Sequence, residues 1–262
     1  MTIPAGLLLN GFDVFILVFV RMTGLFVVAP IFGRQNIPAY FKIGFSFFTA
    51  LILVNTTIVG GFQPDESLLG YTLLVMKEFI VGLSIGFIAY IAFTAIYVAG
   101  EVIDMQIGFG VVSVMDPVSN IQVPITSNLY FMISMLLLML MNGHHVIIKA
   151  IFNSYETLPL GSAVFDASLT DGLMTIFATV FETGFKIAAP VVAAILITDV
   201  ALGTISKMVP QLNIFVIGMP LKIFVGFIIL IITMPMFINI MQSVFREMDG
   251  SMFNYIKELK PE

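Results

Sequence analysis

The sequence predicts an all-α protein of the integral membrane type, with about six long, kinked hydrophobic helices and no soluble domain. Hydrophobic residues make up 59% of its 262 residues and charged residues only 10%, whereas a soluble domain normally carries about 25% charged residues. The mean hydropathy is +1.08. The apolar residues also lie in runs near or above the ~20 that a helix needs to cross the hydrocarbon core of a membrane.

The composition also excludes several kinds of site and partner. The chain has no cysteine, which excludes disulfides, thiolate zinc sites and cysteine nucleophiles. A net charge of −5 without clusters of Lys or Arg argues against nucleic-acid binding. No Lys or Arg precedes Arg21, so we expect the first apolar stretch to be retained rather than cleaved as a signal peptide.

The first two hydrophobic segments end at strong turn signals. The first covers about 12–32 and stops at a polar turn that closes with Pro38, a helix breaker. The second covers about 41–59 and stops at the glycine- and proline-containing stretch 60–65. Each is close to the length that a single membrane crossing needs.

The third, fifth and sixth segments are too long for simple crossings. They cover about 68–100, 173–203 and 214–245, or roughly 45–50 Å each as helix. Tilt absorbs only part of such an excess, so we expect long, bent helices packed largely against other protein. The fourth segment covers about 128–141, and its extension to 151 is left open. Three prolines inside the long segments are expected to kink or break them: Pro190, Pro220 and Pro235.

Charged residues lie inside or beside these apolar segments, where an isolated charge is costly and normally faces protein or water. We predict that they make subunit contacts or pair within the chain. Glu182 and Lys186 are four residues apart with the acid first, which favours an ion pair on one helix face. Self-neutralisation is the preferred interpretation, with docking of a partner as the alternative. The charged residues concerned are Arg21, Lys77, Glu78, Glu101, Asp104, Glu182, Lys186 and Lys222.

The connection 101–124 is the most informative region. It combines acids, two glycines and bulky apolar residues, and Asp116-Pro117 marks a turn. Irregular backbone at membrane depth is tolerated only where it is buried in protein or lines a cavity. The segment is therefore an interfacial loop or broken helix, or a re-entrant plug that closes a pore. The predicted plug residues are Gln106, Ile107, Gly108, Phe109, Gly110, Val111, Val112, Val114, Met115, Asp116 and Pro117.

Other motifs favour ordinary explanations. His144 and His145 are adjacent and would point about 100° apart on a helix, so they are poor co-ligands, and we predict no metal site and no cofactor. Gly82-x-x-x-Gly86 gives weak support for close helix packing. The methionine stripe fits ordinary helix packing better than a deformable seal; it consists of Met132, Met135 and Met139.

Several separated stretches together resemble the FliR/SctT family of type III export gate proteins. They extend over nearly the whole chain and are specific in their order and spacing. The main stretches are Arg21-Met22-Thr23-Gly24, Ala29-Pro30-Ile31-Phe32-Gly33, Lys77-Glu78-Phe79-Ile80-Val81-Gly82, Asp104-Met105-Gln106-Ile107-Gly108-Phe109, Asp116-Pro117 and Val209-Pro210-Gln211-Leu212-Asn213-Ile214-Phe215.

The resemblance implies a non-enzymatic subunit of the bacterial flagellar basal body in the inner membrane. Proteins similar to this one assemble, as a single copy, with FliP and FliQ into a gate that FlhB contacts, and unfolded rod, hook and filament proteins pass through it. By this resemblance residues 1–172 are FliP-like, with the plug at about 106–117, and residues 173–262 are a FliQ-like hairpin with a short charged tail. Contacts with membrane lipids are also expected.

Two other functions stay open on the residues alone. A small-molecule secondary transporter would use broken helices and midplane charges for a substrate site, and an inverted internal repeat would favour it. None is visible in the sequence. An inert assembly scaffold without a pore is the third hypothesis.

Overall fold

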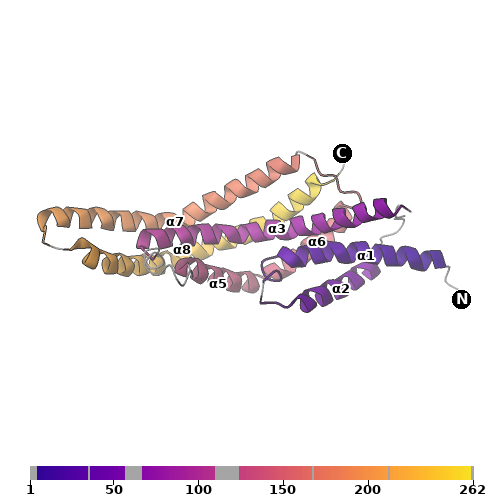
Figure 1. Ribbon diagram of the computed structural model, residues 1–262, viewed down its shortest axis with the longest axis horizontal. Coiled ribbons are helices and arrows are strands. Elements are labelled where there is room, and N and C mark those ends of the chain that lie inside the picture. The colour runs from indigo at the N-terminus through magenta and orange to yellow at the C-terminus, as the bar shows by residue number, and fades with distance from the viewer. Residues whose placement is uncertain are drawn as a thin grey trace. The chain divides into compact units, whose positions relative to one another are not determined.

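The computed structural model describes residues 5–34, 36–56, 67–109, 124–166, 168–211 and 213–260, and the regular structure of these ranges is entirely α-helical (Figure 1). The predicted all-α class is therefore confirmed for the described residues. The helices are α1 (Ala5–Val28), α2 (Ala39–Thr56), α3 (Leu68–Ile107), α5 (Ile125–Leu140), α6 (Gly143–Thr157), α7 (Ser168–Met208) and α8 (Ile214–Glu258).

Four of these helices are long and apolar enough to cross a membrane, namely α1, α3, α7 and α8. A fifth crossing results if α5 and α6, which are bent by 66° at the break between them, form one span. The helix α2 is a shorter apolar helix. The six predicted segments thus correspond to these helices, with the fourth segment divided into α5 and α6.

The break between α5 and α6 has a local cause. Asn142 has a φ of 56°, in the left-handed region, which interrupts the right-handed helix. Asparagine is one of the few residues besides glycine that adopts this conformation at low cost. The helix therefore restarts at Gly143, and the predicted extension of the fourth segment to 151 is a second helix rather than a continuation.

Two helix ends lie further along the chain than predicted. The helix α3 runs past the expected end near Gly100 to Ile107 and stops where Gly108 adopts a φ of 100°. The helix α8 continues to Glu258, so the expected charged tail is largely helical. It is anchored there by buried side chains on one face, among them Met252 and Tyr255. Burial of these apolar side chains keeps this part of the chain helical despite its charged residues.

The internal prolines do not end their helices, contrary to one of the two expected outcomes. Pro190 lies inside α7, and Pro220 and Pro235 lie inside α8. A proline removes one backbone hydrogen bond and crowds the carbonyl four residues earlier, at a cost of about 3 kcal/mol. Both helices exceed forty residues, and their remaining backbone hydrogen bonds are sufficient to keep the chain helical on both sides of each proline.

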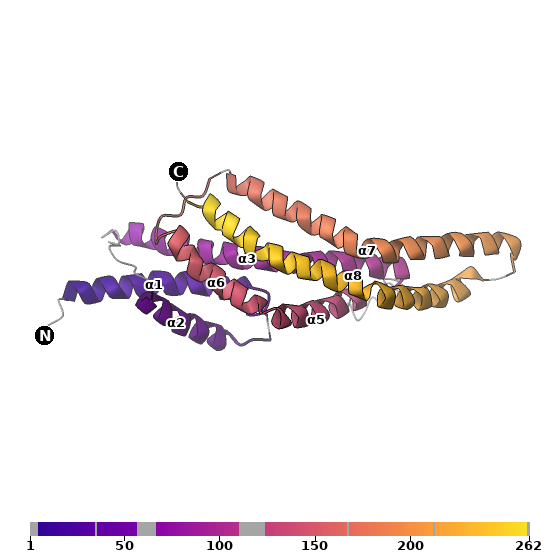
Figure 2. The same ribbon diagram turned by 180° about the vertical axis from the view of Figure 1, so that it is seen from behind.

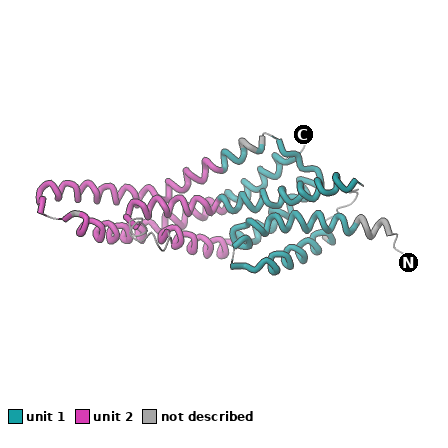
Figure 3. Tube along the Cα trace, viewed as in Figure 1, with its two compact units in different colours: residues 1–91, 142–176, 246–262 teal, residues 92–141, 177–245 magenta. Residues whose placement is uncertain are grey.

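The described chain divides into two compact units (Figure 3). Unit 1 comprises residues 1–91, 142–176 and 246–262, and unit 2 comprises 92–141 and 177–245. These units are defined by internal contacts. The predicted division at residue 172 concerns likeness to two other proteins, which such contacts do not measure, and it stays a prediction.

Unit 1 is built on α1, which lies beside α2 in both views (Figures 1 and 2). The two helices pack through aromatic rings: Phe26 of α1 meets Phe45 of α2, and also Phe32 of the turn between them, at centroid distances of 4.9 Å each. On α3, Gly82 and Gly86 lie directly against the backbone of α1. The predicted close packing at the Gly82-x-x-x-Gly86 motif is confirmed.

Unit 2 joins the end of α3 to α5, α7 and α8. Phe93 on α3 contacts Phe131 on α5 and Phe245 on α8, with ring centroids 5.7 and 5.4 Å apart. Tyr130 on α5 stacks on Phe237 of α8 at 4.1 Å. The core of this unit is thus aromatic and connects helices that are distant in sequence.

Candidate functional site

Arg21 and Glu78 form a buried ion pair within unit 1. Both side chains are completely inaccessible to solvent, and Arg21 Nε donates to Glu78 Oε2 at 2.5 Å. Arg21 Nη1 also donates to Ser154 Oγ at 3.1 Å and to the carbonyl oxygen of Leu158 at 3.2 Å. The other carboxylate oxygen of Glu78 accepts from the backbone N–H of Gly161 at 2.8 Å. Arg21 and Glu78, which the sequence identifies only as two of the charged residues in apolar segments, are therefore ion-pair partners.

The remaining predicted charges behave differently from one another. Glu182 and Lys186 form the predicted ion pair at 2.6 Å, with side chains 64% and 62% exposed. Lys222 on α8 pairs with Asp199 on α7. Asp199 is not among the predicted charged residues, because its ion-pair partner lies on another helix and is not visible from local spacing. Lys77 is half-buried and forms no ion pair with any residue in the described ranges.

The stem of the predicted plug is held by the acid Asp104. Its two carboxylate oxygens each accept from the backbone N–H of Thr126 at 3.1 Å. Thr126 lies in the first turn of α5, where backbone N–H groups have no partner within the helix. The side chain thus connects the last turn of α3 to the start of α5. Glu101, one turn earlier on α3, is exposed instead.

Close packing reinforces this stem. Gly100 lies so close to Ser127 that a Cβ at position 100 would meet the backbone of α5, and Ser127 Oγ donates to the carbonyl oxygen of Tyr97 at 3.2 Å. The ring of Phe109 contacts that of Phe227 on α8, with centroids 6.0 Å apart. The backbone therefore leaves α3 and enters α5 at one fixed junction.

Four of the predicted plug residues belong to this described stem. Gln106 and Ile107 complete α3, and Gly108 and Phe109 form the turn after it. Their placement corrects the expectation of a fully irregular segment, because the helix continues until Gly108. The other predicted plug residues lie outside the described residues: Gly110, Val111, Val112, Val114, Met115, Asp116 and Pro117.

The helices α7 and α8 expose an unusual amount of apolar surface. In their most apolar windows only 28% and 17% of the residues are buried, against 56% in α3. Large exposed patches on a protein surface mark contacts with other proteins or with a membrane. The exposed side chains of unit 2 include Phe181, Phe185, Leu196, Ile197, Val200, Phe215, Val216, Phe224, Ile231 and Ile232.

The sequence of the chain matches that of a known family over most of its length. The family described as "Bacterial export proteins, family 1" matches residues 12–248. The chain belongs to this family. It is 37% identical to the flagellar biosynthetic protein FliR of Bacillus subtilis, over 91% of this chain and 92% of that protein. It is 28% identical to the flagellar biosynthetic protein FliR of Escherichia coli, over 91% of both chains.

Membership of the family establishes the general role of the chain. It is a component of the bacterial flagellar export apparatus, located in the inner membrane at the flagellar basal body, and it works with other proteins of that apparatus. The family is described as one of bacterial export proteins, and the relatives are named flagellar biosynthetic proteins. The predicted resemblance is thus confirmed at the level of the family, while the plug, the pore and the named partners are matters for proposal.

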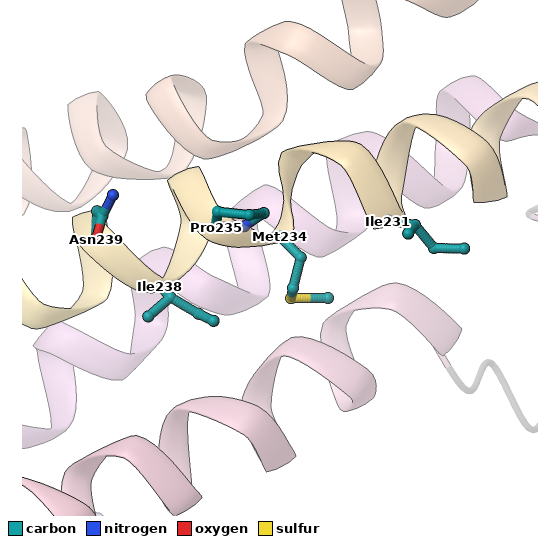
Figure 4. Close-up of a pocket in the computed structure, with 5 residues that line it drawn as sticks. All are labelled: Ile231, Met234, Pro235, Ile238 and Asn239. Atoms are coloured by element: carbon teal, nitrogen blue, oxygen red, sulfur yellow. The ribbon is translucent and has the colours of Figure 1, made fainter.

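An open groove of about 480 Å³ lies along α8 at Pro235 (Figure 4). Met234 and Ile238 point to the same side of the helix around the proline. Four of its five lining residues are apolar, and Asn239 supplies the polar side chain. A substrate site normally combines an apolar pocket with several convergent polar groups. The groove therefore does not favour the transporter hypothesis, and it adds to the exposed apolar surface of α8.

Two motifs from the sequence have simple locations. His144 and His145 lie in the first turn of α6 with ring centroids 4.1 Å apart, and the described residues hold no group of three potential metal ligands around them. The methionine stripe of α5 faces outward, with Met132 and Met139 exposed. These two methionines lie outside the core of the described chain, because the opposite face of α5 carries the buried residues, and their packing against another helix stays a prediction.

Proposed function

We propose that the chain is a core subunit of the flagellar protein export gate and forms a closed pore together with FliP and FliQ. Unfolded rod, hook and filament proteins would pass through this pore, and FlhB would contact its outside. One copy of the chain would take part. The proposal rests on the family and on the surface of the chain.

The exposed apolar faces of α7 and α8 are the observation that carries the proposal. Lipid can cover apolar side chains, but it does not accommodate the Glu182–Lys186 pair on the same face of α7, where both side chains are more than half exposed. Partner helices with polar groups at that level would accept both kinds of side chain. The two helices therefore suit contacts with similar hairpins better than contacts with lipid alone.

The chain would contribute to the gate in two parts. We assign residues 1–172 to a FliP-like part and 173–262 to a FliQ-like hairpin, as their resemblance implies. The pairing of Lys222 with Asp199 across α7 and α8 supports a hairpin that is stable as a unit. Within the first part, residues 106–117 would close the pore. The junction at Asp104 supports this role because it joins the end of α3 to the start of α5, the two helices that flank the connection containing that segment.

The decisive experiment is co-expression of the tagged chain with FliP and FliQ, followed by purification in detergent. We expect a stable joint complex that contains all three proteins. Replacing apolar residues of the exposed face together, as in the double variant Phe185→Asn/Ile197→Asn, should reduce the recovered FliP and FliQ by about fivefold or more, because losing one central contact of an interface costs about 2 kcal/mol or more.

The matched control is Thr204→Asn, which places the same residue on the same helix at an exposed position that is already polar. It should leave recovery within about twofold, as expected for a surface change of a few tenths of a kcal/mol. The membrane level of each variant is measured in parallel. A chain that stays monomeric in the presence of both partners would contradict the gate proposal.

A further inference from the structure

The buried pair Arg21–Glu78 presents a problem for membrane insertion. Each charge lies inside a helix that is apolar enough to cross the membrane, and an unpaired charge at that depth is costly on every scale. The two residues are separated by 57 positions. The helix α1 therefore reaches the membrane before its counter-charge on α3 has been supplied.

The complete set of partners comes from four separate pieces of unit 1. Arg21 on α1 binds Glu78 on α3 through Nε, while its Nη1 reaches Ser154 on α6 and the carbonyl oxygen of Leu158 beyond it. Glu78 uses its second oxygen for the N–H of Gly161. These contacts are therefore made only when α1, α3, α6 and the turn 158–161 have come together, and Arg21 Nη2 is buried without an acceptor among the described residues.

The aromatic ring of Tyr155 covers the charged group on one side. The Arg21 guanidinium carbon lies 4.2 Å from the ring centroid, and the Tyr155 hydroxyl donates to the carbonyl oxygen of Val18 at 3.3 Å. A cation above an aromatic face is attracted by the ring, more strongly where water is absent. This contact also depends on α6, so α6 closes the site around the guanidinium.

The helices that carry the pair leave little room for adjustment. A Cβ at Gly82, one turn after Glu78, would meet the backbone of Arg21, and one at Gly24 would lie 2.5 Å from the carbonyl oxygen of Phe79. Backbone therefore meets backbone beside the pair, and both charged side chains are inaccessible to solvent. The charges are therefore either enclosed together or exposed to a membrane that does not tolerate them.

We propose that Arg21 and Glu78 act as a clasp that makes retention of unit 1 in the membrane depend on the joint docking of α1, α3, α6 and the turn 158–161. An incompletely assembled chain leaves one or both charges uncompensated and is removed by membrane proteolysis. The completed clasp neutralises both charges and protects the chain. This device works within the chain and does not depend on the proposed gate function.

The test follows the lifetime of the full-length chain in bacterial membranes by pulse-chase labelling and alkaline extraction. Glu78→Gln keeps the shape and an acceptor for Gly161 but removes the negative charge, and Arg21→Met removes the positive charge. Each single variant should shorten the lifetime by about tenfold or more, since a buried charge is left without its partner. The double variant Arg21→Met/Glu78→Gln leaves no buried charge and should return to within about twofold of the parent.

Two exposed charges at the C-terminal end of unit 1, Glu258 and Lys260, provide the matched control. Glu258→Gln and Lys260→Met make the same chemical changes where neither charge is buried, and each should alter the lifetime by less than about twofold. Two truncations of ordinary core residues, Leu17→Ala and Ile85→Ala, should shorten the lifetime and should not rescue each other. Single charge variants as long-lived as the parent would overturn the clasp. So would a double variant as short-lived as the singles.

Discussion

At Gly82 a missing side chain decides how closely two helices of unit 1 approach. This residue lies against the backbone of Arg21, and Gly86, one turn later, lies against the backbone of Leu25 with slightly more room. Such small residues allow backbone-to-backbone packing in a membrane, where helices associate by van der Waals contact and hydrogen bonds. The close approach of the helices at Gly82 also encloses the nearby charges of Arg21 and Glu78. The same glycine therefore supports both the helix packing and the buried ion pair.

The substitution Gly82→Ala should therefore be damaging. The added methyl group meets backbone that cannot rotate away, and overpacking typically costs about 1–3 kcal/mol. Thermal unfolding of the purified chain in detergent should show a lower Tm. The control is Gly203→Ala on α7, where an added Cβ has open space and alanine favours helix by up to about 1 kcal/mol. An equal loss in both variants would contradict the packing argument.

The start of α5 depends on a side chain from another helix. Pro124 precedes the helix and provides no side-chain cap, so the free N–H groups of the first turn need another acceptor. Asp104 supplies it from α3 through its contacts with Thr126. The junction between α3 and α5 thus needs residues from both helices, and the sequence of either helix alone does not predict it.

Replacement of this acid, Asp104→Ala, should loosen the start of α5. Losing a capping carboxylate costs about 0.5–2 kcal/mol, and hydrogen exchange of the amides in the first turn of α5 should become faster. The control Glu101→Ala removes an acid one turn earlier that is exposed, and exchange in α5 should not change. Protection that is equal in both variants would show that Asp104 does not hold the helix.

The whole molecule combines one well-packed set of helices with a hairpin that buries little of itself. This contrast fits a subunit whose assembly is completed by other chains, as proposed for the gate. Phe109, the last described residue of the predicted plug, contacts Phe227 of α8 beside the junction of α3 and α5.

Deletion of residues 108–114 should raise ion leakage through the closed gate. The deletion removes the turn after α3 and most of the bulky apolar residues of the predicted plug, while Asp104 and Thr126 remain. Leakage is measured as loss of membrane potential in cells that produce the assembled complex, with Glu101→Ala as the control. If the complex assembles and leakage is unchanged, the plug assignment fails and family membership is unaffected.

The sequence was sufficient for the class and the approximate positions of the helices, because hydrophobic length and composition are local properties. Glu182 and Lys186 could also be paired from their spacing of four residues. The partners of Arg21 and Lys222 could not be predicted, since they lie on other helices. Periodicity likewise could not show that Met132 faces outward, because an apolar residue can lie against lipid, a partner or the core.

Helix ends were predicted less well for a related reason. The predicted end of α3 near Gly100 is wrong, because Gly100 lies inside the helix and admits α5 at close range. The same residue type does end α3 at Gly108, where φ is positive. The two roles of glycine differ in tertiary context, which a single sequence does not contain.

The ion pairs have a consequence for how the chain responds to membrane voltage. Moving one elementary charge through 100 mV is worth about 2.3 kcal/mol, but two opposite charges that move together transport no net charge. Arg21–Glu78, Glu182–Lys186 and Asp199–Lys222 are each such a couple. A change in voltage therefore exerts no net force on these three couples, whatever the value of the membrane potential.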